Sequence, residues 1–468
     1  MIDLVDVVRF IHAVLWCGGI AVLINPLSTE YEVVNYLEIS RPSVLAGDAS
    51  TWPALLAAAS RQDLLVDKSI SIDGKDLNVQ NIITLNHLFS QQESLPPFDL
   101  TGRDAKHYTA VVYFSSGTSG KAKGVELSHY NIVAHMLALR ATSPSYWNAS
   151  VRGVFFAPLC HIYGLMKVAL MGAWVGFYTM LQKRFTLESY LDLSVKVSAN
   201  ALRILPTIAV AIVKQSDFDI SRLYNVKYIM CTGAVLPPAI IEIFRKYMPK
   251  ASTIQGYGMT ETSVTFMIPE SAHHIGSVGK LLACIEGRIV DDEGKDVPEG
   301  EEGEMLVKGP TVFRRYMGNP EASREAFDGP WMKTGDVVRV DKDGFWWLKE
   351  RKKELIKYKG FQVAPAELEG HLNSYQDVSE GAVCALWDEN QGTEVPIAYI
   401  ALTPAAKAMR GQRNEILRNI QEHVNSKVAP YKKLRGVVAL DQIPKSGSGK
   451  ILRRLLPARL ARARAVRL

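Results

Sequence analysis

The sequence predicts an α/β protein with a large amino-terminal domain and a smaller α+β domain after it. At 468 residues the chain is too long for a single hydrophobic core, so we expect two or three domains. Up to about residue 240, apolar runs typical of buried strands alternate with amphipathic helical patterns, which predicts parallel sheets with crossover helices. Between about 276 and 349 the pattern changes to short strands and Gly/Asp/Glu turns, which predicts a small β-rich subdomain.

The predicted elements of the first half follow one another closely. A helix over 4–15 comes first, with no strand before it, and a buried strand follows at 19–26. Further strands are predicted at 43–46, 111–114, 154–157 and 226–231, and further helices at 127–140 and 237–248. The longest apolar run, 164–181, contains Lys167 and several glycines, so we expect a buried helix and a strand there rather than a membrane span.

A dense run of charged residues at 350–357 interrupts this pattern and predicts a surface linker. After it we expect helices near 365–372 and 413–427 within an α+β segment. The predicted domains are therefore residues 1–349 and 350–468.

The net charge and the cysteine spacing of the sequence argue against some classes of protein. The net charge of +6 is modest and suits anionic small molecules, and no aromatic-basic motif for reading RNA is present. Five cysteines are scattered along the chain without a CxxC pair, which argues for a reduced intracellular compartment and against structural zinc.

Residues 115–124 read SSGTSGKAKG and directly follow an apolar, strand-like run. Glycines in this loop let the backbone turn its amide groups inward, and such amide nests bind anionic oxygens. The hydroxyl side chains and Lys123 add donors and positive charge. The spacing differs from that of a Walker A loop, so the alternatives are a phosphate-binding loop of another kind or a solvent-exposed loop.

A second motif, QGYGMTE at 255–261, follows a strand that we expect to end near Ile254. Open α/β sheets bind ligands at the carboxyl ends of their strands. Thr260 can donate a hydrogen bond to a phosphate, and Glu261 can bind a hard cation such as Mg²⁺. A purely structural turn is the alternative.

Three further residues are ambiguous on their own. Asp336, in KTGD, either caps a turn or accepts two hydroxyl hydrogens, as ribose recognition requires. His161, in PLCHIYG, lies among apolar residues, where a histidine is more often part of the core than a catalyst. Lys450 follows two glycines and can either swing into a site or stay solvated.

The order and wording of these motifs resemble those of the acyl-adenylate-forming superfamily, and most closely the coumarate–CoA ligase-like enzymes. The matching segments are SSGTSGKAKGVELSH, PLCHIYG, QGYGMTETS, KTGD, ERKKELIKYKGFQVAPAELE and PKSGSGKILRR. The similarity runs from about residue 7 to 455. It implies an AMP-forming acid–thiol ligase that uses ATP, CoA and Mg²⁺. In such enzymes a carboxylic acid attacks the α-phosphate of ATP, and the CoA thiol then displaces AMP from the acyl adenylate.

The resemblance also implies roles for the residues of the first half-reaction. Lys450 matches the catalytic lysine that bridges the carboxylate and the α-phosphate, where preorganised positive charge is needed. Glu261 matches the Mg²⁺ contact, and Asp336 matches the ribose-binding carboxylate. The other ATP or AMP contacts that it implies are Ser115, Ser116, Gly117, Thr118, Ser119, Lys123, Gln255, Gly256, Thr260 and Arg351. The acyl and adenylate contacts that it implies are His161, Tyr163, Ala234, Gln255, Gly256 and Met267. In the family the histidine is catalytic and gates the entry of the acid.

For the second half-reaction, Lys357 and Gln362 match catalytic positions of the small domain. The CoA contacts that the resemblance implies are Arg184, Lys359 and Gly360. Glu350 lies at the hinge of the family, where an Asp is usual. We therefore expect the small domain to be mobile and to rotate about Glu350, so that one site serves both half-reactions.

The sequence departs from the family pattern in three places. Ala122 replaces the usual proline of the phosphate loop, which makes the loop more flexible without removing a ligand. Cys160 stands where a Phe is common. The family has further α/β structure before the region where this chain begins, so we expect an exposed sheet edge in an amino-terminally shortened domain.

The function and the substrate keep alternatives open. A catalytically impaired, truncated homologue that acts as a binding protein is one alternative, and an adenylating enzyme with a carrier-protein thiol or oxygen as acceptor is another. An amino-acid-adenylating module would need a carboxylate near His161 to pair with the substrate ammonium group, and that segment has none. The acid itself is either an aryl-propenoic acid or a medium-chain or otherwise specialised acyl acid.

Partners and location follow from the same patterns. We expect a small-molecule carboxylic acid as the partner, with no nucleic acid and no membrane span, while the oligomeric state is not predicted. The terminal residues 466–468, VRL, resemble the peroxisomal Ser-Lys-Leu signal only in their last two positions. A cytoplasmic location is therefore favoured over a peroxisomal one.

Overall fold

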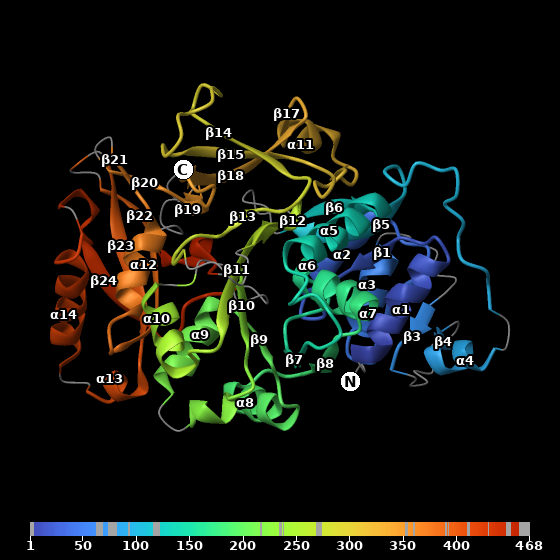
Figure 1. Cartoon of the computed structure of the whole chain (residues 1–468), viewed down its shortest axis with the longest axis horizontal. Helices are drawn as coiled ribbons and strands as arrows, with labels where there is room; N and C mark the ends of the chain where they lie inside the picture. Colours follow the sequence, from blue (N-terminus) through green and yellow to red (C-terminus); the bar gives the residue numbers. More distant parts are fainter. Residues whose placement is uncertain are drawn as a thin grey trace.

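The computed structural model describes residues 4–61, 69–73, 82–91, 94–115, 122–215, 218–233, 236, 238–267, 274–351, 354–358, 361–388, 391, 393–409, 412–428, 430–445 and 451–457. Figure 1 shows a large body beside a smaller one, the smaller in orange and red at the left. The predicted α/β class, with a large amino-terminal and a smaller carboxyl-terminal domain, is confirmed. None of the described helices is both long and apolar enough to cross a membrane.

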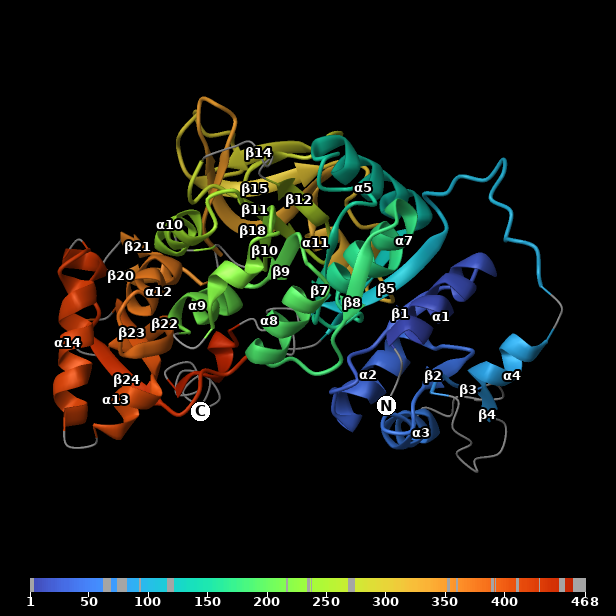
Figure 2. The same cartoon turned by 60° about the horizontal axis from the view of Figure 1, so that its bottom comes forward.

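The amino-terminal part contains two small sheets, each with helices beside it. Its elements are α1 (Leu4–Trp16), β1 (Ala21–Leu23), α2 (Glu30–Ser40), β2 (Leu45–Gly47), α3 (Trp52–Arg61), β3 (Ser69–Ser71), β4 (Ile82–Thr84) and α4 (Leu85–Ser90). Strands β2, β3 and β4 form a parallel sheet of their own. The predicted helix over 4–15 is confirmed by α1, whose Ile11 is buried in the main core. Figure 2 shows α3 and α4 next to this sheet.

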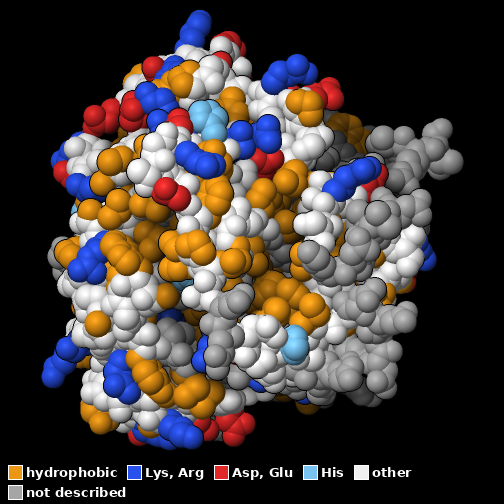
Figure 3. All heavy atoms as spheres, turned by 90° about the vertical axis from the view of Figure 1, so that its right-hand side faces the viewer, with side chains coloured by type: hydrophobic (Ala, Val, Ile, Leu, Met, Phe, Trp, Pro, Cys, Tyr) orange, Lys and Arg blue, Asp and Glu red, His pale blue; other side chains and the backbone are white. Residues whose placement is uncertain are grey.

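Hydrophobic side chains remain exposed over the amino-terminal elements. Trp16, Tyr31 and Phe89 are each more than half exposed. Figure 3 shows hydrophobic side chains gathered on the side of the molecule where these elements lie.

The strands on either side of the predicted phosphate loop belong to a four-stranded sheet. Its strands are β1, β5 (Thr109–Ser115), β6 (Lys123–Ser128) and β16 (Arg315–Tyr316), in the order β1-β5-β6-β16. β1 pairs with β5 in parallel, whereas β6 runs antiparallel to β5 and β16. Helix α5 (His129–Thr142) begins directly after β6, and a reciprocal capping box between Ser128 and Asn131 fixes its start.

The central sheet has the order β13-β12-β11-β10-β9, with β9, β10 and β11 parallel. Its strands are β9 (Ala201–Ile204), β10 (Tyr228–Thr232), β11 (Ser252–Met259), β12 (Ser263–Met267) and β13 (Lys280–Leu281). Helices α8 (Leu187–Lys196), α9 (Pro206–Lys214) and α10 (Pro238–Tyr247) cover one face, where Leu202 and Ile229 are fully buried. Helices α5 and α7 (Met171–Val175) cover the other face, where Met230 and Ile254 are buried.

The long apolar run at 164–181 forms a buried helical segment and a strand, as predicted. The segment consists of α6 (Ile162–Gly164), a π-helical stretch over Leu165–Leu170, and α7. Strand β8 (Tyr178–Leu181) follows and pairs in parallel with β7 (Arg152–Phe155).

The regular secondary structure of the β-rich part predicted over about 276–349 consists almost entirely of strands. These are β13, β14 (Glu286–Val290), β15 (Gly303–Lys308), β16, β17 (Phe327–Asp328), β18 (Trp331–Val340) and β19 (Trp346–Arg351), with one short helix, α11 (Pro320–Glu325). β14, β15, β18 and β17 form one sheet, and β19 pairs with β18.

The carboxyl-terminal part has its own core. A sheet in the order β22-β23-β24 joins β22 (Val378–Asp388), β23 (Thr393–Leu402) and β24 (Gly436–Leu440). The other elements are the hairpin β20 (Ile356–Tyr358) and β21 (Phe361–Val363), and helices α12 (Pro365–Asn373), α13 (Pro404–Ala408) and α14 (Arg413–Asn425). Leu368 of α12 and Ile420 of α14 are completely buried against this sheet.

Two local predictions are wrong. The strand expected to end near Ile254 continues to Met259, because residues 256–259 pair antiparallel with β12 after the parallel pairing with β10 ends at Gly256. The charged run at 350–357 is not a surface linker throughout. Its first two residues belong to β19, and Leu355 and Ile356 are buried.

Candidate active site

The carboxyl ends of β10 and β11 bring three residues into one row. Thr232 of β10 lies opposite Gly256 of β11, which in turn lies opposite Met267 of β12. A Cβ atom at position 256 would approach Cγ2 of Thr232 to 3.2 Å, so glycine keeps the surface between these strands open. Gly256 and Met267, both predicted acyl or adenylate contacts, are therefore neighbours.

Gln255 organises the loops around this row. Its side chain is 3% exposed. Its Oε1 accepts a hydrogen bond from the Leu236 amide (2.8 Å), and its Nε2 donates to the Ser277 carbonyl (3.2 Å). The side chain therefore ties together two loops at this edge of the sheet.

Within the motif at 255–261, Gly258 is the position with the least room for a side chain. The pairing of β11 with β12 is irregular between Tyr257 and Gly258, and a Cβ atom at 258 would lie 1.8 Å from the Ser263 carbonyl oxygen. Ser263 itself adopts a positive φ of 57°. A side chain at 258 would therefore force the two strands apart.

We expect Gly258→Ala to lower the free energy of unfolding by about 3 kcal/mol, because a backbone oxygen cannot move aside as a side chain can. Thermal unfolding of the purified protein measures this effect. Gly370→Ala in α12 is the matched control, since a Cβ atom there meets no atom within 4 Å. Equal melting temperatures for the two variants would contradict the close approach of β11 and β12.

The KTGD and QGYGMTE motifs meet at Asp336. This carboxylate is 2% exposed and accepts a short hydrogen bond from the hydroxyl of Tyr257. Its backbone amide donates to Oγ1 of Thr334, and Arg351 of β19 lies directly opposite it in the register of β18 and β19. Two predicted nucleotide contacts, Asp336 and Arg351, are thus adjacent, with the aromatic ring of Tyr257 beside them.

Glu261 lies in the turn between β11 and β12, directly after the partly buried Thr260. Its carboxylate is buried and accepts a hydrogen bond from the Tyr316 hydroxyl (3.0 Å). Burial, together with this carboxylate, raises the pKa of Tyr316, so the phenol stays a donor. Nζ of Lys123 lies 4.8 Å from the centre of the Tyr316 ring, which links Glu261 to the end of the predicted phosphate loop.

The residues at Glu261 fit a magnesium ion bound together with phosphates. A buried carboxylate is a ligand that Mg²⁺ prefers, and Mg²⁺ sites in nucleotide enzymes take one or two carboxylates plus phosphate oxygens. Among the described residues no group of three or more His, Cys, Asp or Glu could hold a metal by itself.

The predicted phosphate loop is held at both ends. Ser115 at the end of β5 lies opposite Lys123 at the start of β6, so the loop closes a β-hairpin. Gly124 allows close packing there, because a Cβ atom would lie 3.2–3.3 Å from side-chain atoms of Ile39, Val112 and Met317. Residues 116–121 lie outside the described residues.

The PLCHIYG segment forms the start of the helix at α6. The exposed His161 caps this helix, its Nδ1 accepting a hydrogen bond from the Tyr163 amide (3.3 Å). Gly164 is required because a Cβ atom there would lie 2.5 Å from the Pro158 carbonyl oxygen. Burial raises the pKa of the Cys160 thiol to about 11, which makes it unreactive near neutral pH.

The predicted residues of the small domain are placed in part. Lys357 and Gln362 lie opposite each other across the β20–β21 hairpin, and the exposed Arg184 follows β8 in the large domain. Lys450 itself lies outside the described residues, but both flanks of its loop are anchored. Nζ of Lys445 pairs with Glu380 (2.6 Å), and the Lys445 and Ile451 backbones form a β-bridge.

Several predicted site residues are not described. Residues outside the described ranges are Ser116, Gly117, Thr118, Ser119, Ala234, Lys359, Gly360 and Lys450. The backbones of Arg351, Lys357 and Gln362 are placed, but their side chains are not described.

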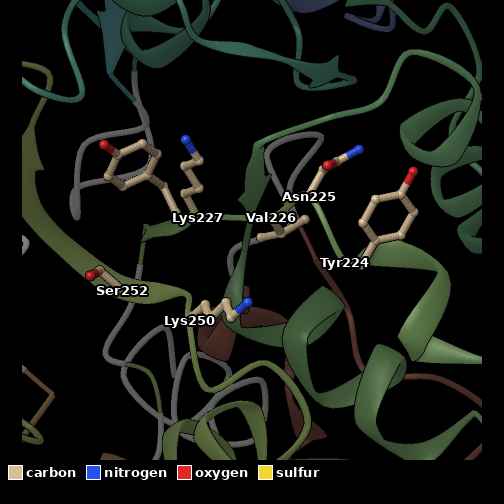
Figure 4. A pocket seen from close by; sticks show the side chains of 7 residues that line it. Tyr224, Asn225, Val226, Lys227, Lys250 and Ser252 are labelled. Carbon is tan, nitrogen blue, oxygen red and sulfur yellow. The ribbon is translucent and has the colours of Figure 1, made fainter.

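One pocket lies far from these residues along the strands. Figure 4 shows it at the amino ends of β10 and β11, opposite the ends that carry Thr232 and Gly256. It has a volume of about 520 Å³ and is lined by Tyr224, Asn225, Val226, Lys227, Tyr228, Lys250 and Ser252. None of the residues predicted for the site lines it, so it is not the nucleotide site.

Sequence reasoning missed three residues that organise the site. Tyr257 and Tyr316 hydrogen-bond to the two acidic residues, and Arg453 forms ion pairs with Glu354 and Glu369 just after the Lys450 loop. Tyr257 and Arg453 lie within recognisable motifs, whereas Tyr316 lies outside all of them. Their partners are 55 to 99 residues away along the chain, so spacing could not identify them.

Comparison with known proteins gives the family. The model of the AMP-binding enzyme family matches residues 2–317, and that of the AMP-binding enzyme C-terminal domain matches residues 367–450. The chain is 33% identical to 4-coumarate–CoA ligase-like 9 of Arabidopsis thaliana, covering 95% of this chain and 76% of that protein. It is 32% identical to the peroxisomal OPC-8:0-CoA ligase 1 of the same plant, covering 94% and 80%.

Solved structures agree with this assignment. The structure resembles o-succinylbenzoate coenzyme A synthetase from Bacillus subtilis in complex with ATP and magnesium ion, with a TM-score of 0.78 and 25% identity. The similarity covers 96% of this chain and 86% of that one. The prediction that the protein is an enzyme, an AMP-forming acid–CoA ligase by class, is confirmed at the level of the family. The chain belongs to the AMP-binding enzyme family, among the relatives named 4-coumarate–CoA ligase-like.

Proposed function

We propose that this chain activates a carboxylic acid with ATP, as an acyl adenylate, and transfers the acyl group to CoA with release of AMP. One observation carries the proposal: the buried Asp336 is joined to Tyr257 at the end of the central sheet. A buried carboxylate beside an aromatic ring, at the carboxyl end of parallel strands, suits the ribose and base of a nucleotide. The family membership and the ligase relatives support the same reaction.

We assign different parts of the nucleotide to different residues. Asp336 would accept hydrogen bonds from the ribose hydroxyls, with Arg351 beside it as a second contact. Lys123 and the loop after Ser115 would bind the phosphates, and Glu261 would hold the Mg²⁺ that neutralises their charge. This charge balance matters because a carboxylate and a triphosphate repel each other in the first step.

We assign the binding of the acid to a surface that runs from His161 and Tyr163 to Gly256 and Met267. His161 is exposed at the start of α6, which suits a gate for the incoming acid. The small surface left by Gly256 next to Thr232 gives an acyl chain room to pass. The acid enters as a negatively charged group, so attack on the α-phosphate needs the positive charge that we assign to Lys450.

For the thioester step we assign Lys357 and Gln362 to the reacting groups and Arg184, Lys359 and Gly360 to CoA. Rotation of residues 350–468 about Glu350 would exchange the Lys450 loop for the hairpin that carries Lys357. Leu355 and Ile356 are buried directly after this hinge, which suits a rigid small domain that moves as one body. The location, cytoplasmic or peroxisomal, stays a prediction, because residues 466–468 lie outside the described residues.

The test measures AMP release by the purified full chain with ATP and Mg²⁺, across aryl-propenoic and aliphatic acids, with and without CoA. We expect acid-dependent AMP release that CoA accelerates, together with an acyl-CoA product. AMP release that is unaffected by CoA, but rises with a carrier-protein thiol, would move the proposal to a different acceptor. A folded protein that releases no AMP with any acid would contradict it.

A further inference from the structure

Two cations are buried together behind the proposed acyl site. Lys167, in the π-helical stretch after α6, is 3% exposed, and Arg203, in β9, is 2% exposed. Burial, followed by the charge of Arg203, lowers the pKa of Lys167. Two neighbouring buried cations are costly unless an anion compensates them.

The surroundings of both cations are aromatic and neutral. Nζ of Lys167 lies 4.0 Å from the Trp147 ring centre, and the guanidinium of Arg203 lies 4.9 Å from that of Phe177. Arg203 donates to the hydroxyls of Tyr146 (3.4 Å) and Thr179 (3.0 Å). No carboxylate of the described residues lies within ion-pair distance of either cation.

Donors without acceptors remain in this cluster. Nη2 of Arg203 is buried and has no hydrogen-bond partner in the described part of the chain. His135, which lies near Lys167, uses its Nε2 to accept from the Val264 amide, so its other nitrogen, Nδ1, carries a hydrogen and is likewise unpartnered. A buried donor without an acceptor loses the free energy of its hydration in water. An acceptor atom of a bound ligand would compensate this loss.

The cluster is continuous with the proposed acyl site. Tyr163 lies one helical turn before Lys167. Its buried hydroxyl has no hydrogen-bond partner among the described residues. Arg203 and the hydroxyl of Thr232 both lie near this phenol. Thr232 in turn lies opposite Gly256, so a row of side chains leads from the adenylate position to the two cations.

We propose that Lys167 and Arg203 bind a second carboxylate at the far end of the acid substrate, so that the preferred substrates are dicarboxylic acids. This inference rests on the proposed function, since it assigns the substrate class of the same site. The distal carboxylate would accept from Nη2 of Arg203 and pair with Nζ of Lys167. It would supply the negative charge that the described residues lack, and charge-assisted hydrogen bonds of this kind are stronger than neutral ones.

The experiment compares straight-chain dicarboxylic acids with monocarboxylic acids of the same length, from four to ten carbons. Binding in the presence of ATP is measured by the shift in melting temperature and by calorimetry, independently of turnover. We expect the best dicarboxylic acid to bind roughly tenfold to a hundredfold more tightly than its monocarboxylic counterpart. Lys167→Met and Arg203→Met are each expected to remove most of this preference.

Two matched controls separate charge from position. Lys246→Met and Arg222→Met each remove an exposed cation that lies over an aromatic ring, and both should keep the preference. Without ligand, Lys167→Met should melt at a higher temperature than the wild type, because a buried unpaired cation is replaced by an apolar side chain. A purely structural lysine would instead lower the melting temperature when it is replaced.

The outcomes distinguish this inference from the proposed function. Equal binding of the two acid classes, or a preference that survives Lys167→Met, overturns the inference. AMP release from monocarboxylic acids in that case would leave the proposed function intact. A preference for dicarboxylic acids that Lys167→Met removes supports the inference even when no acid releases AMP, a result that counts against the ligase reaction alone.

Discussion

Replacing Asp336 with asparagine is expected to lower kcat/KM for ATP by roughly 10²–10³-fold in the AMP-release assay. The carboxylate is buried and lies between Tyr257 and the backbone of Arg351, where it can accept from two ribose hydroxyls. Asparagine keeps the shape and one acceptor oxygen but loses the charge, and hydrogen bonds to a charged group contribute about 1.5–3 kcal/mol each. Most of the loss should appear as a higher KM for ATP.

The matched control is Asp343→Asn, in the exposed turn between β18 and β19. It should leave kcat/KM within about twofold of the wild type, and both variants should have the same circular dichroism spectrum. If Asp336→Asn were as active as Asp343→Asn, the nucleotide could not be bound at this carboxylate.

The second large effect is expected for Arg453→Met, which removes three ion-pair contacts at once. Arg453 binds both oxygens of Glu369 (2.8 and 2.7 Å) and one oxygen of Glu354 (2.7 Å). Burial raises the pKa of Glu369, while Arg453 opposes this shift by stabilising the charged form. Removing one partner of a buried pair leaves the other charge uncompensated and costs roughly 3–5 kcal/mol.

Hydrogen exchange of the full chain measures this loss in the small domain alone. The amides of β22 and β23 should exchange faster in Arg453→Met, whereas those of β9 and β10 in the large domain should not change. Arg418→Met, at an exposed position of α14, is the control and should change the free energy of opening by less than about 0.5 kcal/mol. The additional change Glu369→Gln should recover part of the stability, because it removes the uncompensated charge.

We expect the same contacts to give Arg453 a positioning role for Lys450. Arg453 follows the loop at 446–450 by three residues, and Lys445 before the loop is paired with Glu380. The described residues on both sides of this loop are therefore held in place. Arg453→Met should therefore slow adenylate formation more than transfer from a preformed acyl adenylate to CoA. Equal effects on the two half-reactions would mean that Arg453 only stabilises the domain.

The parallel strands were predictable because buried parallel strands form continuous apolar runs. Strand β10 lies where the run at 226–231 predicts a strand, and helix α14 matches the periodic pattern at 413–427. The segment at 255–261 was not predicted correctly, since its two glycines are typical of turns. There the partner strand β12 and the close approach at Gly258 outweigh the local preference.

The motifs of the site were predictable from the sequence, but the contacts between residues far apart in the chain were not. The acidic residues Glu261 and Asp336 stand out only through the motifs that contain them, because a lone carboxylate beside a glycine can equally cap a turn. Tyr257 and Tyr316 carry no such signal, because a tyrosine serves equally well as a core residue. Lys167 was visible only as a polar interruption of an apolar run. Its burial near Arg203 depends on how the π-helical stretch over Leu165–Leu170 and strand β9 come together in the fold, which no local pattern specifies.

The most direct test of the account is the exchange of labelled pyrophosphate into ATP, measured without CoA. Reversible formation of an acyl adenylate predicts that label enters ATP only when a suitable carboxylic acid is present, and that Asp336→Asn strongly reduces the exchange. Hydrolysis of ATP to ADP and phosphate, or an exchange that does not depend on any acid, would contradict the assignment of this site to adenylate formation.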